Sequence, residues 1–149
     1  MRNVTIAGAM FTMAAGMAHA QQVDLEGGIL PYEDEAAVAL GASIYEDNCA
    51  SCHGAELEGQ PNWQDPGPNG RRPAPPHDAT GHTWHHPDSQ LFLITKFGIE
   101  ALVGGDYKSD MPGFKEVLND QEILDVLAFI KSTWPDRVIE THNKINADQ

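Results

Sequence analysis

The two cysteines of this 149-residue chain lie three positions apart and directly before a histidine, in the stretch Cys49-Ala50-Ser51-Cys52-His53. A disulfide between them would close a loop too small to stabilise the fold much. A zinc site would need a second pair of ligands at matching spacing, and the chain has no further cysteine. A redox-active dithiol belongs beside a βαβ pattern, which the sequence lacks.

The same motif, Cys-x-x-Cys-His, is the attachment signal of c-type haem. Two thiols one helical turn apart can reach the two vinyl groups on one edge of the porphyrin and form thioethers. The adjacent histidine then offers a ring nitrogen to the iron. We therefore expect one covalent haem c, bound through Cys49 and Cys52, with His53 as an iron ligand.

The first twenty residues are typical of a secretory signal peptide. Arg2 supplies a positive start, residues 4–15 are mostly apolar but too short to span a bilayer, and Ala18-His19-Ala20 matches a signal-peptidase site. We expect cleavage before Gln21 and export to the periplasm. No later stretch predicts a membrane span.

The chain is strongly acidic. Removal of the first twenty residues takes away Arg2 and leaves eight Lys and Arg residues against 22 Asp and Glu residues, a formal net charge of −14. Such a charge repels nucleic acid and anionic membranes, so neither is an expected partner. Solubility of a secreted protein explains the acidity equally well.

Apolar spacing predicts an all-α fold with few helices. The first should run from the acidic residues 33–35 into the cysteines, and the second from Pro87 to Gly98. Asn119 and Glu122 form a capping-box signal for a third helix that ends at Pro135, and a short helix is expected in the tail. No alternating strand pattern occurs.

A long loop separates the first two helices. Most of the ten prolines lie between Pro61 and Pro87, interleaved with glycine. Structureless loops of this length are uncommon unless something organises them, and the apolar stripes are too few for an ordinary core. A bulky cofactor at the centre would both organise the loop and complete the core.

Met111, in the stretch SDMPGF, is the only methionine expected in the mature chain. A lone loop methionine usually only fills a gap in the packing. In a haem protein it is the candidate sixth ligand, because a soft thioether favours ferrous iron and raises the reduction potential.

From about Asp34 to Trp134 the chain resembles a monohaem class I cytochrome c. The matching stretches are GASIYEDNCASCHG, the Pro-rich segment, SDMPGF and LNDQEILDVLAFIKSTW. The resemblance implies a class I cytochrome c fold, with helices wrapped around the haem and the first and last helices of the domain crossing. We divide the chain into a signal peptide (1–20), a flexible lead-in (21–33), the cytochrome domain (34–134) and a C-terminal extension (135–149).

The resemblance also implies the roles of site residues. His53 and Met111 carry over as the proximal and distal iron ligands. A proline carbonyl after the haem motif should accept the other N–H of the proximal histidine, and of three prolines in RRPAPP we choose Pro75. Gly41 and Tyr45 should meet the apolar stripe of the last helix.

The segment before the second helix departs from the family pattern, because it is rich in histidine. These imidazoles could bind a second metal, copper or zinc, but packing against the haem is favoured because no carboxylate or cysteine completes a set. Arg71, Arg72 and Trp84 are candidates for binding the haem propionates or for supporting contacts. The candidate second-metal residues are His77, His82, His85 and His86.

These features predict a periplasmic electron carrier that is not an enzyme and binds no small-molecule substrate. Its redox partners should present a basic docking patch, because the chain is acidic. The alternatives are a haem-bearing subunit of a larger periplasmic oxidoreductase, a haem peroxidase or sensor, and a copper-binding protein.

Overall fold

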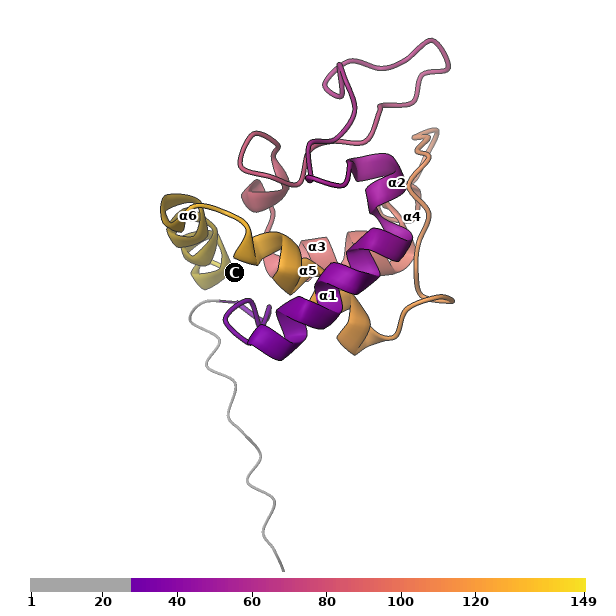
Figure 1. Cartoon of the computed structure of the whole chain (residues 1–149). Helices are drawn as coiled ribbons and strands as arrows, with labels where there is room; N and C mark the ends of the chain where they lie inside the picture. The colour runs from indigo at the N-terminus through magenta and orange to yellow at the C-terminus, as the bar shows by residue number, and fades with distance from the viewer. Residues whose placement is uncertain (1–27) are drawn as a thin grey trace, which may run out of the picture.

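The computed structural model describes residues 28–149, and all regular elements in this range are helical (Figure 1). The predicted all-α class is therefore confirmed. The predicted signal peptide and residues 21–27 of the lead-in lie outside the described residues. The elements are α1 (Glu35–Asn48), α2 (Ala50–His53), the 3-10 helix η2 (Thr83–His85), α3 (Asp88–Phe97), α4 (Ile99–Val103), α5 (Asp120–Ser132) and α6 (Asp136–Ala147).

Helix α1 carries the chain to the first cysteine. Asp34 caps it, because its Oδ1 accepts hydrogen bonds from the backbone N–H groups of Ala36 and Ala37 at 2.9 and 3.3 Å. The helix was expected to continue through both cysteines. Instead the backbone departs from helical geometry at Cys49 (φ −120°, ψ −40°), and α2 begins at the next residue.

Helices α1 and α5 cross in the lower half of the molecule in Figure 1 and form its main contact. Gly41 makes the approach possible, since a Cβ there would lie 2.0 Å from the Asp125 carbonyl oxygen and 2.9 Å from Phe129 Cβ. Tyr45 packs against Phe129 one turn later, with ring centroids 5.4 Å apart. The stripe residues Val126, Leu127 and Ile130 are buried in the same core.

The start of α5 is the predicted capping box. Asn119 Oδ1 accepts from the Glu122 N–H at 3.0 Å, and the Glu122 carboxylate accepts from the Asn119 N–H at 2.8 Å. The helix ends at Ser132. Trp134, two residues later, is nevertheless buried. Its indole N–H donates to the His77 carbonyl at 2.7 Å, so a residue just after α5 contacts the Pro-rich loop directly.

The tail forms a full helix, α6, which packs beside η2. Its His142 is completely buried, and Nε2 lies 3.0 Å from the His86 carbonyl oxygen and 3.3 Å from Asp88 Oδ1. Asn146 Oδ1 accepts from the Asp88 N–H at 2.8 Å. The C-terminal extension is therefore packed onto the rest of the fold through polar contacts.

The Pro-rich loop extends away from the helices at the top of Figure 1, and the segment between α4 and α5 runs along the right-hand side. None of the helices among residues 28–149 combines the length and apolar character needed to cross a membrane.

Candidate haem site

The two thiols of the motif are unpaired. Cys49 links α1 to α2 and is half-buried, whereas Cys52 is exposed. Burial and the neighbouring Cys52 raise the pKa of Cys49 to about 11. A redox-active dithiol requires the opposite shift, towards a stabilised thiolate. The raised pKa of Cys49 does not favour thioredoxin-like chemistry, and both sulfurs are available for covalent attachment.

His53 ends α2 and is buried, with 6% of its surface exposed. Its Nδ1 lies 2.8 Å from the carbonyl oxygen of Pro75. A carbonyl can only accept, so Nδ1 carries the hydrogen and the lone pair on Nε2 is free. Burial lowers the pKa of His53, although the Pro75 hydrogen bond opposes the shift. A buried, neutral imidazole with a fixed tautomer is the form that binds a metal.

His77 supports His53 in a way that the sequence did not reveal. The two imidazole rings stack with centroids 3.9 Å apart and an interplanar angle of 21°. His77 Nδ1 lies 2.8 Å from Thr83 Oγ1, and burial together with His53 holds its pKa well below the ordinary value. Nothing in the spacing of the sequence predicts this contact, because it depends on the path of the Pro-rich loop.

Tyr45 is a second supporting residue that the sequence linked only to helix packing. Its hydroxyl donates to the Gly54 carbonyl at 2.9 Å, immediately after the haem motif. Tyr45 thereby joins the α1–α5 core to the end of α2, so helix packing also positions His53.

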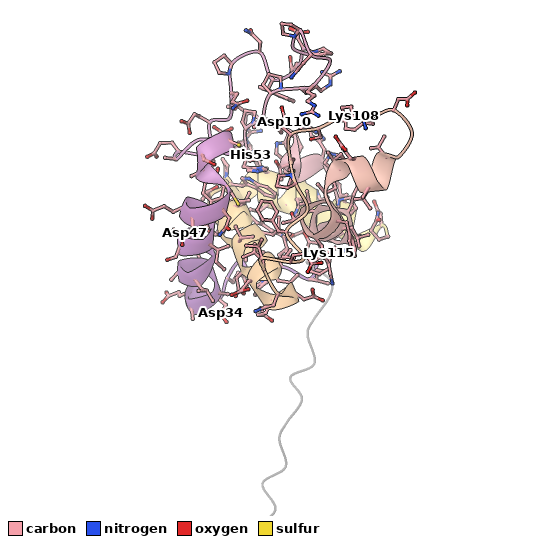
Figure 2. All side chains as sticks on the ribbon, turned by 90° about the vertical axis from the view of Figure 1, so that its right-hand side faces the viewer. Asp34, Asp47, His53, Lys108, Asp110 and Lys115 are labelled. Atoms are coloured by element: carbon pink, nitrogen blue, oxygen red, sulfur yellow. The ribbon has the colours of Figure 1, made fainter. Side chains whose placement is uncertain are left out.

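Met111 is half-buried in the segment between α4 and α5. Its backbone N–H donates to Ser109 Oγ at 3.1 Å. The preceding residue, Asp110, forms an ion pair with Arg71 of the Pro-rich loop. Figure 2 shows His53 and Asp110 in the upper part of the helical body, near the base of that loop. The segments that carry Pro75 and Met111 are thus connected.

The candidate propionate-binding residues have different surroundings. Arg71 is engaged by Asp110, and Arg72 is exposed. Trp84 Nε1 is buried and has no hydrogen-bond partner. A buried indole N–H without an acceptor fits a bound group that carries carboxylates, as haem does. Together with the free thiols and the free Nε2 of His53, it makes the donor set suitable for haem.

The remaining candidate histidines contact aromatic rings. His82 stacks on Trp63 (5.2 Å between centroids) and meets the edge of His86, whereas His85 stacks on Trp84 at 3.6 Å. Across the part of the chain that the structure describes, no group of three or more His, Cys, Asp or Glu side chains is placed to hold a metal ion. The arrangement gives no support to a second metal site.

The sequence matches the family model described as Cytochrome c over residues 38–134. The chain belongs to the cytochrome c family. Membership confirms the resemblance and implies covalently bound haem c, for which Cys49 and Cys52 are the available thiols. Membership in this family fits a domain that carries haem for electron transfer.

Two curated relatives are cytochrome subunits of oxidoreductases. The cytochrome c subunit of gluconate 2-dehydrogenase from Pantoea cypripedii is 30% identical over 122 residues, which cover 71% of this chain and 24% of that protein. Subunit FixP of the cbb3-type cytochrome c oxidase from Sinorhizobium medicae (strain WSM419) is 24% identical over 106 residues, which cover 68% of this chain and 32% of that protein. The chain thus spans a quarter to a third of their length. The comparison with solved structures finds no match.

Proposed function

We propose that this cytochrome c carries electrons in the periplasm with His53 and Met111 as the axial ligands of its haem. The observation that carries the proposal is the hydrogen bond from His53 Nδ1 to the Pro75 carbonyl. It presents Nε2, in the neutral form, as a ligand whose ring orientation is fixed. When bound, the haem supplies reversible one-electron chemistry between ferric and ferrous iron.

The protein's contribution is attachment, ligation and burial. Cys49 and Cys52 hold the group covalently, and Met111 offers a thioether that stabilises the ferrous state and raises the potential. Trp84 Nε1, buried without an acceptor, is suited to a propionate oxygen. None of these roles requires a substrate pocket.

Mass spectrometry and one visible spectrum test the proposal. The protein expressed in cells competent for cytochrome maturation should gain the mass of one haem, and the ferric form should show the weak far-red band of a methionine–iron bond. Met111→Ala should abolish that band and let carbon monoxide bind the reduced protein. Val117→Ala, at a 65%-exposed position in the same segment, is the control and should change neither. A bare polypeptide mass would contradict the proposal.

The carbon monoxide measurement also separates the carrier from its rivals. A haem peroxidase or ligand sensor needs an open or labile sixth position, whereas a methionine-ligated carrier does not. Carbon monoxide binding by the unaltered protein at neutral pH would therefore favour an enzyme or sensor. A copper-binding protein would retain copper after dialysis, and elemental analysis should find iron alone.

The proposed location is the periplasm, and the signal peptide is cleaved before Gln21 during export. N-terminal sequencing of the exported protein tests this, and a mature protein that begins at Met1 would contradict it. The proposed partners are redox proteins with a basic docking patch, because the chain has a formal charge of −13.

A second candidate role is that of an electron-transfer subunit within a larger oxidoreductase. It is favoured by the two relatives, whose names describe such subunits. Size-exclusion chromatography of a native extract distinguishes the two roles. A free carrier elutes as a single processed chain, smaller than the 16.2 kDa of the uncleaved one, whereas a subunit elutes with its complex.

A further inference from the structure

We propose that Arg71 and Asp110 form a positioning pair that holds the Met111 segment against the Pro-rich loop and thereby protects the methionine–iron bond from displacement. The inference rests on the proposed role of Met111 as the sixth ligand. In this inference the Arg71 guanidinium binds the Asp110 carboxylate and not a haem propionate, which was the role expected for Arg71.

The ion pair connects two segments that lie 39 residues apart in the sequence. Arg71 stands four residues before Pro75, whose carbonyl orients His53, and Asp110 stands directly before Met111. One pair of side chains therefore connects the support of the proximal ligand to the segment of the distal ligand. Figure 2 shows Asp110 at the base of the Pro-rich loop, on the side where His53 lies.

The backbone of Arg71 is held by two hydrogen bonds within its own loop. Its N–H donates to Asn69 Oδ1 at 3.0 Å, and its carbonyl accepts from the Gly67 N–H at 2.8 Å. These bonds form a tight turn that presents the guanidinium. A preorganised donor loses less conformational entropy when the ion pair forms.

The Met111 segment is also anchored on its own side. Ser109 N–H donates to Glu100 Oε1 of α4 at 2.7 Å, and Met111 N–H donates to Ser109 Oγ. Beyond Met111, Phe114 N–H donates to the Thr95 carbonyl of α3 at 3.0 Å. These bonds tie the segment to α3 and α4, and the ion pair adds the connection across to the Pro-rich loop.

The pair is too exposed to contribute much to global stability. The exposed fractions are 39% for the Arg71 side chain and 64% for Asp110, and surface pairs of this kind contribute little to unfolding free energies. Opening of a single loop involves far fewer interactions than unfolding does. A small contribution can therefore shift the loop equilibrium measurably while leaving unfolding unchanged.

Imidazole titration of the ferric holoprotein tests the inference, because imidazole competes with a methionine sulfur for the iron. In Arg71→Gln and in Asp110→Asn, imidazole should bind about two- to fivefold more tightly than in the unaltered protein. The double variant should show no larger effect than either single variant, since each substitution removes the same interaction. The urea midpoint of unfolding should stay unchanged in all three.

Asp106→Asn is the matched control, because it removes the same charge from the same exposed segment without touching the pair. It should leave imidazole binding unchanged. An equal effect of Asp106→Asn would overturn the pairing in favour of a general charge effect. An effect of Arg71→Gln without one of Asp110→Asn would overturn it in favour of a direct contact between Arg71 and the haem.

The far-red band and imidazole binding together distinguish a wrong axial ligand from a wrong positioning role. If the unaltered ferric protein lacks the methionine far-red band, Met111 is not the ligand and both proposals are wrong. If the band is present and none of the variants changes imidazole binding, the positioning role alone is wrong.

Discussion

Gly41 marks the place where a single hydrogen atom replaces a side chain between two helices. The Asp125 carbonyl oxygen and Phe129 Cβ occupy the space into which a methyl group would project. Because the nearest atom belongs to a helix backbone, α5 must shift to admit a larger residue.

Gly41→Ala should therefore lower the free energy of unfolding by about 1–3 kcal/mol, the usual cost of overpacking. Urea denaturation of the holoprotein, followed by circular dichroism, measures the change. Ser43→Ala, on the exposed side of the same helix, is the control and should change stability by less than about 0.5 kcal/mol. Equal effects of both substitutions would mean that the helix crossing does not depend on Gly41.

At the residue scale, sequence reasoning succeeded where bond chemistry determines the spacing. Two thiols and a histidine within five residues identify covalent haem, and the family match agrees. The choice of Pro75 also agrees with the hydrogen bond in the structure. The partners of Arg71 and His77 could not be predicted, because both contacts depend on how a long loop folds back.

Asn119 caps the N-terminus of α5, because its side-chain oxygen accepts a hydrogen bond from the Glu122 N–H. Asn119→Ala should lower the free energy of unfolding by about 1 kcal/mol, because the Glu122 N–H loses its acceptor. Asn119→Asp keeps that acceptor and should change stability by only a few tenths of that amount. Thermal or urea unfolding compares the three proteins. A loss of similar size in Asn119→Asp would contradict the cap as the cause.

Helix α6 is attached through a buried polar cluster of Asp88, Lys131 and His142, whose exposed fractions are 2%, 0% and 0%. Asp88 Oδ2 accepts from the backbone N–H groups of Ile29 and Leu30 at 2.7 and 3.2 Å. The cluster thus joins the start of the described chain to α3, α5 and α6. Burial first, and then the charge of Lys131, lower the pKa of His142 despite the opposing influence of Asp88.

This lowered pKa predicts that the fold is sensitive to acid. Below pH 6.5 the unfolded chain protonates His142 more readily than the folded protein does, so stability should fall as the pH decreases through that value. The loss can reach about 1.4 kcal/mol per pH unit for one proton. His142→Gln should reduce the slope of unfolding free energy against pH between 7 and 5, as measured by urea titrations.

Val138→Ala provides the comparison, because Val138 is buried on the same helix and carries no titratable group. It should lower stability at every pH and leave the slope unchanged. If His142→Gln leaves the slope as it was, proton uptake by His142 is not the cause of the acid sensitivity.

At the element scale, helices with clear caps and apolar stripes were predictable. The second helix was expected from Pro87, and α3 indeed runs from Asp88 to Phe97 with Pro87 as its cap. Helix α4 and η2 were missed, because five and three residues are too few for a period to emerge. The packing of α6 was also missed, because its buried face combines the apolar Val138 with the polar His142 and so gives no purely apolar stripe.

At the scale of the whole molecule, negative charge dominates, with 22 acidic residues against 9 basic ones. Figure 2 shows Asp34 and Asp47 along α1, and Asp110 beside Lys108 in the segment that precedes α5. At low ionic strength, where screening is weak, this net negative charge should attract small cations and repel small anions.

The rate of reduction by the cation hexaammineruthenium(II) should therefore fall as the salt concentration rises, because screening weakens attraction. Reduction by the anion ferrocyanide should respond in the opposite direction. Stopped-flow measurements on the ferric holoprotein between about 10 and 300 mM salt cover Debye lengths from roughly 30 Å down to below 8 Å. Identical salt dependence for both reagents would contradict electrostatic steering.

One arrangement near the haem motif has a consequence for engineering. The acceptor that orients His53 is a backbone oxygen, so no exchange of a side chain can delete it. It can only be displaced, and a larger residue at Gly59 is one way to displace it. Gly59 has a φ of +67°, and a Cβ there would lie 2.6 Å from the Pro75 carbonyl carbon and 2.4 Å from Pro76 N. Replacement of this glycine would tune the electron affinity of the iron remotely, with every ligand left in the sequence.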